Sequence, residues 1–109
     1  MNYTQKVFEV VKKIPKGNVM TYGEISKLTG VDPRMVGWAL HANKDSSGVP
    51  CHRVVNKDGR LAPGYAFGGP NEQRNRLQSE GVKFIDNTHV DLNISLDMSV
   101  FKNRPVSFM

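Results

Sequence analysis

The sequence predicts one mainly helical domain with a short β-hairpin, in which two consecutive helices form a helix-turn-helix. Three observations predict this fold class. The chain has 109 residues, enough for one modest hydrophobic core. Its first part contains three segments in which apolar residues recur at helical spacing. The residues that follow alternate short apolar runs with clusters of turn-forming residues.

The first helix is predicted over residues 3–13, where valine and phenylalanine side chains fall on one face among polar residues. Pro15 and Gly17 end this pattern. A second helix begins at a capping box formed by Thr21 and Glu24 and runs to about residue 28.

A third helix is predicted close behind the second, which Gly30 ends. Asp32 supplies an N-cap acceptor and Pro33 fits the first helical position, so the helix runs from Arg34 to about Ala42. The two helices form a candidate helix-turn-helix, with residues 33–42 as the part offered to DNA. Helical hairpins are common, so the pattern alone does not identify a DNA-binding protein.

The second half predicts shorter elements. Residues 49–55 are mostly apolar and indicate a short strand or hairpin with Cys51 near its beginning, followed by a tight turn at residues 56–59. Residues 62–70 read as a loop rich in glycine and proline, and residues 71–79 as a helix that Gly81 ends.

The chain divides into a domain at residues 1–84 and a C-terminal extension at residues 85–109. The extension alternates weakly, which predicts a terminal hairpin packed on the same domain. Its alternating apolar residues are Val90, Leu92, Ile94 and Leu96.

The composition favours a globular, intracellular protein with an acidic partner. The formal charge is +5 and the sequence pI is about 9.6, a balance that favours polyanions without naming one. No apolar run approaches the length of a membrane span, and no leader segment is recognisable, so we expect a cytoplasmic protein. We also expect no cofactor and no metal, because the histidines at positions 41, 52 and 89 lack ligand spacing.

Cys51 is the single cysteine, so it is either a small buried apolar residue or a reactive thiol. His52 and Arg53 give it an electropositive neighbourhood, which favours thiolate. Successive side chains on a strand point to opposite faces, so His52 reaches Cys51 directly only if the chain turns there, as Pro50 allows. Otherwise a bridging water or a remote carboxylate must complete the relay.

The run Pro50-Cys51-His52-Arg53-Val54 resembles the acceptor-cysteine motif of the O6-alkylguanine-DNA alkyltransferases. Upstream, Arg34-Met35-Val36-Gly37 resembles the family's arginine-finger helix. The resemblance covers about residues 3–84 and corresponds to the family's C-terminal DNA-binding and active-site domain, without the larger N-terminal domain of many members. It implies a winged-helix-like helix-turn-helix domain. In size the chain is similar to the alkyltransferase-like proteins.

The resemblance implies a catalytic set in which Glu80, His52 and a water deprotonate Cys51. Asn43 resembles the hinge asparagine that braces the turn before the cysteine. Tyr22 resembles the tyrosine that helps rotate the target nucleotide and protonates guanine N3.

The resemblance also implies a DNA-binding face and a base pocket. The helix would enter the minor groove of double-stranded DNA containing O6-alkylguanine, and Arg34 would fill the stack that the flipped base leaves. Main-chain groups at Cys51 and Val54 would read the base edge. The expected DNA-contacting residues are Tyr22, Arg34, Gly37, Ala39 and His41, and the expected pocket residues are Leu40, Val54, Tyr65 and Phe67.

The loop after the acceptor motif departs from the family pattern, which usually reads Tyr-Ser-Gly-Gly. Here residues 64–69 are longer by one residue and lack that serine. The favoured hypothesis is a monomeric, single-turnover transferase that alkylates Cys51 irreversibly. The alternatives are a lesion-binding protein that recruits other repair factors without catalysis, and a plain helix-turn-helix regulator.

Overall fold

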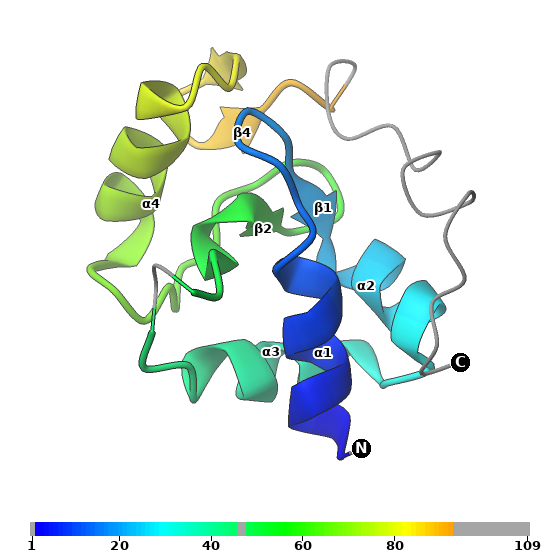
Figure 1. Ribbon diagram of the computed structural model, residues 1–109. Coiled ribbons are helices and arrows are strands. Elements are labelled where there is room, and N and C mark those ends of the chain that lie inside the picture. Colours follow the sequence, from blue (N-terminus) through cyan, green and yellow to red (C-terminus); the bar gives the residue numbers. More distant parts are fainter. Residues whose placement is uncertain (1, 46–47, 93–109) are drawn as a thin grey trace.

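The computed structural model of the chain describes residues 2–45 and 48–92 (Figure 1). Four α-helices are the longest regular elements of this described part, as predicted, and the strands are short. The helices are α1 (Tyr3–Val11), α2 (Tyr22–Thr29), α3 (Pro33–His41) and α4 (Gly69–Ser79). The strands are β1 (Met20–Thr21), β2 (Val54–Val55), β3 (Phe84–Asp86) and β4 (His89–Val90), and a 3-10 helix, η1, spans Cys51–Arg53.

The capping signals of the helix-turn-helix are confirmed. The Glu24 amide donates to the Thr21 hydroxyl at 3.1 Å, and the Thr21 amide donates to the Glu24 carboxylate at 2.9 Å. Gly30 ends α2 with a φ of 73°, in the left-handed region that favours glycine. The Arg34 amide donates to the Asp32 carboxylate at 2.8 Å, which begins α3 as expected.

Helices α1 and α4 differ from their predicted bounds by two residues. A capping box between Asn2 and Gln5 begins α1, which ends at Val11 rather than at residue 13. Helix α4 begins at Gly69 rather than at residue 71, because the first helical turn tolerates Pro70, whose missing N–H needs no partner there.

The expected short strand is present, but it begins only at Val54 and does not include Cys51. Cys51 lies in η1, where the Arg53 amide donates to the Pro50 carbonyl at 3.0 Å. Only the two residues of β2 are extended, and β2 pairs in parallel with β1, so that Met20 faces Val54. The apolar run is therefore a tight turn followed by a buried strand, because Pro50 has a fixed φ and no N–H for a ladder.

The β1–β2 pair lies between two hydrophobic clusters. The alternation of side chains along an extended segment explains this arrangement. Val54 belongs to the cluster formed with α1, α2 and α3, whereas Val55 belongs to the cluster formed with α4 and the C-terminal hairpin. Val19 and Met20 divide between the same two clusters. Successive residues of an extended segment point to opposite sides, so β2 contributes to both clusters, as do Val19 and Met20 at the start of β1. Figure 1 shows this pair at the centre of the molecule.

The hairpin of β3 and β4 packs onto the second cluster through Val90, which is 1% exposed. Gly59 allows the close approach, because a Cβ atom there would lie 2.4 Å from the Val90 carbonyl oxygen. The hairpin lies at the start of the segment for which the alternating apolar residues predicted a terminal hairpin. Ile94 and Leu96 lie outside the described residues.

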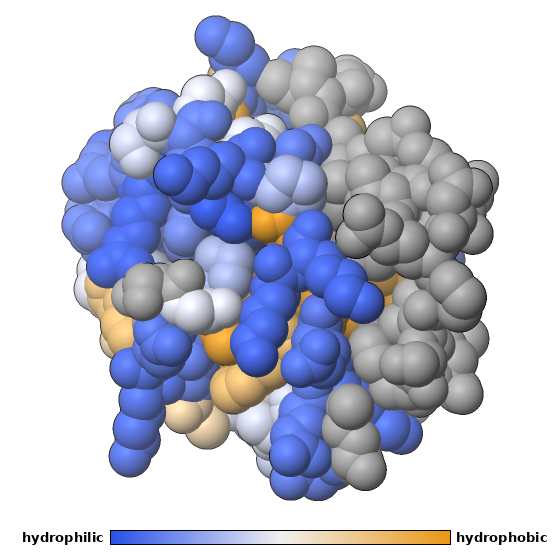
Figure 2. Space-filling view, viewed as in Figure 1, coloured by the Kyte–Doolittle hydropathy of each residue, from blue (hydrophilic) through white to orange (hydrophobic). Residues whose placement is uncertain are grey.

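Polar residues dominate the face seen in Figure 2, where apolar residues emerge only as a narrow central strip. Within residues 2–45 and 48–92, no helix is both long and apolar enough to cross a membrane. In the same part of the chain, no three side chains of His, Cys, Asp or Glu gather as metal ligands.

Gln73 of α4 joins the two halves of the fold. Its side chain is fully buried and donates to the carbonyls of His52 at 3.1 Å and Val54 at 2.9 Å. Its amide oxygen accepts from the Ala62 amide at 2.8 Å. The three bonds hold η1, β2 and the following loop against α4, since buried backbone groups need partners.

Gln73→Met is therefore expected to lower the free energy of unfolding by about 3 kcal/mol, because it keeps the side-chain volume but leaves a buried amide and two carbonyls without their partner. Chemical denaturation followed by circular dichroism measures this loss. Gln78→Met, on the exposed face of the same helix, is the matched control and should change stability by no more than about 0.5 kcal/mol. Equal losses in the two variants would contradict the role assigned to Gln73.

Candidate active site

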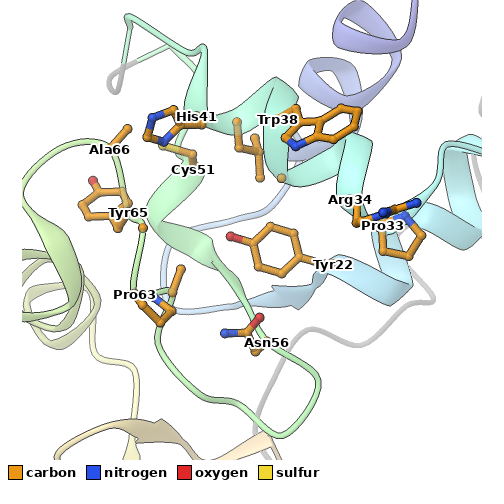
Figure 3. Close-up of a pocket in the computed structure, with 14 residues that line it drawn as sticks. Tyr22, Pro33, Arg34, Trp38, His41, Cys51, Asn56, Pro63, Tyr65 and Ala66 are labelled. Atoms are coloured by element: carbon orange, nitrogen blue, oxygen red, sulfur yellow. The ribbon is translucent and has the colours of Figure 1, made fainter.

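A cavity of about 480 Å³ opens between α3, η1 and the loop that follows Leu61 (Figure 3). Tyr22 enters it from the start of α2, and Tyr65 faces it from the loop. Cys51 lies at its wall, next to His41 in the view of Figure 3. The remaining lining residues are Pro33, Arg34, Gly37, Trp38, Leu40, Asn56, Ala62, Pro63, Gly64 and Ala66.

Asn43 holds the segment that leads to Cys51. Its side-chain amide donates to the Val49 carbonyl at 2.9 Å and lies 3.6 Å from the Cys51 Sγ, within range of a hydrogen bond to sulfur. Its side-chain oxygen accepts from the Asp45 amide at 3.0 Å. The side chain is 5% exposed, so these bonds replace water inside the fold. Asn43 thus braces both the turn and the thiol.

Cys51 is buried, with 5% of its surface exposed, and burial raises the pKa of its thiol above the usual range. The hydrogen bond from Asn43 and the charge of Arg76 lower the pKa but do not outweigh burial. We expected His52 and Arg53 to favour the thiolate form of Cys51. This expectation is wrong for the free protein, because burial raises the pKa of the thiol. Arg53 is engaged elsewhere, so adjacency in sequence did not place its charge at the sulfur.

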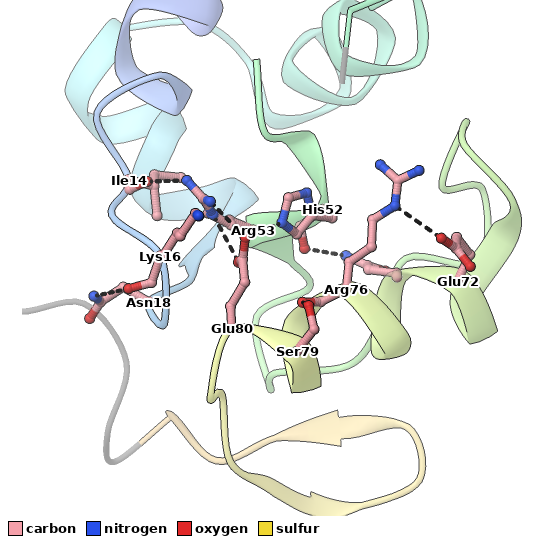
Figure 4. A network of polar contacts seen from close by, with 10 residues as sticks. Ile14, Lys16, Asn18, His52, Arg53, Glu72, Arg76, Ser79 and Glu80 are labelled. Atoms are coloured by element: carbon pink, nitrogen blue, oxygen red, sulfur yellow. Dashed lines mark hydrogen bonds and ion pairs between the residues drawn. The ribbon is translucent and has the colours of Figure 1, made fainter. Parts of the chain in front are cut away.

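Arg53 binds Glu80 with both ends of its guanidinium group (Figure 4). Its Nε donates to Oε1 at 3.0 Å and its Nη2 donates to Oε2 at 2.7 Å, while Nη1 donates to the Ile14 carbonyl at 2.7 Å. Bidentate pairs of this kind are strong and fix orientation. The Glu80 carboxylate is thereby held at the end of α4, facing η1.

His52 lies against the same carboxylate. Its Nε2 lies 3.1 Å from Glu80 Oε2, in polar contact with the carboxylate. Nδ1 is buried and has no hydrogen-bond partner among the described residues. The predicted pairing of His52 with Glu80 is thus present, and it leaves one ring nitrogen available to a proton carrier.

The pKa values of this pair favour a neutral imidazole beside an anion. Burial lowers the pKa of His52, and the Glu80 carboxylate opposes that effect without cancelling it. Burial raises the pKa of Glu80, but hydrogen bonds from Arg53 and His52 outweigh it and hold the pKa below the usual range. At neutral pH the group therefore consists of a carboxylate and an uncharged base.

Both tyrosines of the cavity keep their protons. Burial, followed by the influence of Cys51, raises the pKa of Tyr65 to about 12 and that of Tyr22 above the usual range. The Tyr65 hydroxyl is buried and has no hydrogen-bond partner among the described residues. The guanidinium of Arg76 lies 5.7 Å from the centre of the Tyr65 ring, which holds that ring at the cavity wall. Two protonated phenols thus face the cavity as donors.

Not every predicted site residue reaches the cavity. Ala39 is 1% exposed and belongs to the core of the first cluster, so it does not lie on the outer face of α3. Val54 is fully buried, and Phe67 packs against the Tyr65 ring at 5.9 Å, outside the cavity wall. Gly37 lies at the wall, and a Cβ atom there would meet nothing within 4 Å.

Sequence reasoning missed three residues of the site. Arg53 was assigned to the thiol rather than to Glu80, 27 residues away in the chain. Gln73 has no local signal, since a glutamine on a polar helix resembles a surface residue. Trp38 was not among the predicted site residues, although its position four residues after Arg34 places both on one helical face.

Comparison with known proteins agrees with this geometry. The family model described as 6-O-methylguanine DNA methyltransferase, DNA binding domain, matches residues 2–82. The chain is 42% identical to a methylated-DNA–protein-cysteine methyltransferase of Thermococcus kodakarensis over 74% of its own length and 45% of that protein. It therefore spans less than half of that relative.

A second relative is covered almost completely. The chain is 33% identical to alkyltransferase-like protein 1 of Schizosaccharomyces pombe over 89% of its own length and 92% of that protein. The crystal structure of S. pombe Atl1 with damaged DNA containing O6-carboxymethylguanine superposes with a TM-score of 0.73 at 32% identity, covering 86% of this chain and 94% of that one. The chain belongs to the 6-O-methylguanine DNA methyltransferase family, of which it contains the DNA-binding domain.

Proposed function

We propose that this domain accepts an O6-alkylated guanine, flipped out of duplex DNA, and transfers its alkyl group to Cys51. The observation that carries the proposal is the position of Cys51 at the wall of a base-sized cavity, next to Asn43 and to a His52–Glu80–Arg53 group. Small binding sites in proteins commonly have a volume of this order. Family membership supports the same chemistry.

The outer face of α3 is the proposed contact with DNA. Arg34 lies at the cavity rim with a side chain that is 83% exposed, and its ion pair with Asp32 is long, at 3.9 Å, and exposed, so the guanidinium can leave it to enter the stack vacated by the flipped base. Gly37 has no side chain, so the backbone of α3 beside the cavity can approach the narrow minor groove closely. The formal charge of +5 favours a duplex.

In the proposed reaction the thiol proton moves through a water to Nδ1 of His52, and Glu80 stabilises the imidazolium that forms. The Cys51 thiolate then attacks the alkyl carbon in line, forming an S–C bond as the C–O6 bond breaks. The electron pair of that bond stays with guanine, and Tyr22 supplies a proton at N3. Its raised pKa keeps that proton available at neutral pH.

The products of this step are unmodified guanine and an S-alkylated Cys51, and the proton held by His52 returns through water to Tyr22. A thioether has no acyl or phosphoryl group for water to attack, so the chain would act once.

Lesion binding without transfer is the second candidate function. It is favoured by the almost complete coverage of alkyltransferase-like protein 1 and by the raised pKa of the Cys51 thiol. A helix-turn-helix regulator would need only the face of α3 and would leave the assembled Cys51 group without a purpose.

The test is to mix the protein with a duplex containing O6-methylguanine and to measure its intact mass. We expect a gain of one methylene group in the unmodified protein and none in Cys51→Ser, which keeps the shape of the side chain. Lesion-selective binding without a mass gain would instead support the lesion-binding candidate. Equal affinity for lesion-containing and undamaged duplexes would support the regulator.

The rate of transfer is expected to depend on the protonation of His52. Its pKa lies below the usual value of about 6.5, so the base stays neutral at pH 7, and the rate declines only as the pH falls through that lowered pKa. Glu80→Gln removes the carboxylate that raises the pKa of His52. The decline should therefore move to lower pH, while the rate at neutral pH falls about tenfold or more.

Single-turnover transfer rates measured across pH 4.5–8 follow this shift. Glu9→Gln, which removes a half-exposed carboxylate on α1, is the control and should leave the profile unchanged. A Glu80→Gln profile that keeps the original acidic decline would rule out His52 as the base.

A further inference from the structure

Trp38 is the single tryptophan of the chain, and it is 60% exposed on α3. It lines the cavity, and Figure 3 shows its indole ring at the rim, on the same helix as Arg34 and His41. Large aromatic side chains usually bury most of their surface. We therefore expect an indole that lies outside the core, at the cavity rim, to contact a binding partner.

Trp38 contributes little to the packing of the fold. Its neighbours Val36, Ala39 and Leu40 supply the buried side of α3, with exposed fractions of 5% or less. Trp38 lies on the opposite side of the same helix, outside both hydrophobic clusters. Its side chain therefore contributes apolar surface at the cavity rim and not to the packing of the helices.

The position of Trp38 on the helix relates it to Arg34. Arg34, Trp38 and His41 follow the spacing i, i+4 and i+7, which places them along one face. Four residues of helix rise about 6 Å, close to two base steps of about 3.4 Å each along one DNA strand. An indole at this distance from an inserted arginine reaches the nucleotides next to the vacated position.

We propose that Trp38 is an aromatic contact for the DNA strand that carries the lesion, packing on the sugar and base edges within two steps of the flipped nucleotide. The inference rests on the proposed function, since it requires the lesion to sit in the cavity. Trp38 serves as an apolar wedge of the kind that minor-groove proteins use to hold an opened step. It adds affinity without reading the sequence, because every base presents an apolar face.

Charge favours DNA over a protein surface as the occupant. The chain has a formal charge of +5, and the rim beside Trp38 carries Arg34, whose ion pair with Asp32 is long, at 3.9 Å, and exposed. The cavity that Trp38 lines also contains Cys51, so an occupant of the cavity must pass the indole. A base bound against Cys51 stays attached to its strand and brings the neighbouring sugars to this rim.

The experiment uses the full chain, in which Trp38 is the single source of tryptophan emission. Emission is recorded while a duplex containing O6-methylguanine is added, and affinity is measured in parallel by anisotropy of a labelled duplex. We expect the emission to be quenched with the same midpoint as binding. Trp38→Ala should weaken lesion binding about tenfold, and Trp38→Phe should stay within about threefold.

Two further readouts separate contact from chemistry. The DNA concentration that gives half of the maximal transfer rate should rise about tenfold in Trp38→Ala, in step with the loss of affinity. Ile85→Ala is the matched control, because Ile85 is 68% exposed on β3, which lies away from α3 in Figure 1, and its affinity should not change. Thermal unfolding checks that each variant is folded.

Unchanged emission at saturating lesion DNA would overturn the proposal, and this result needs no variant. Full affinity of Trp38→Ala would overturn it as well. If the unmodified chain binds no lesion DNA, the proposed function and this inference both fail. If it binds the lesion while Trp38 stays unquenched, the inference alone fails.

Discussion

The bidentate pair between Arg53 and Glu80 is the interaction on which the site depends. It joins the end of α4 to η1, and through the bond from Arg53 to the Ile14 carbonyl it also holds the segment after α1. A buried carboxylate needs such a partner to remain charged. Because Arg53 fixes Glu80, the carboxylate lies beside His52 with a defined orientation, and Gln73 fixes the backbone of the same turn from the other side. The position of Cys51 follows from these constraints.

Burial then decides the chemistry of the resting site. Cys51 and His52 both lie where charge is disfavoured, so burial moves their pKa values in opposite directions and leaves a neutral thiol near a neutral base. A thiol kept neutral is protected from the oxidation and exchange reactions that require thiolate. In the proposed reaction, His52 takes the thiol proton when an alkyl carbon lies in line with the sulfur. The group around Cys51 is thus suited to one reaction with one occupant of the cavity.

The sequence was informative where the signal is local. The capping box of Thr21 and Glu24, the stop at Gly30 and the start at Asp32 depend on residues within one helical turn, and each was predicted. The parallel pairing of β1 with β2 joins segments far apart in the chain, and it was missed, whereas the turn at Cys51 was one possibility that Pro50 left open. The pairing of His52 with Glu80 came from family resemblance alone. Arg53 and Ala39 were misassigned because the sequence does not show in which direction either side chain points.

The central claim is that the fold keeps the Cys51 thiol protonated until the lesion occupies the cavity. The direct measurement is the ultraviolet absorbance of thiolate in the free protein as a function of pH, with the Cys51→Ala variant subtracted. A midpoint above the usual cysteine value of about 8.5 is predicted, because burial outweighs the hydrogen bond from Asn43. A midpoint below that value would contradict the account, since it would mean that the free protein already stabilises thiolate.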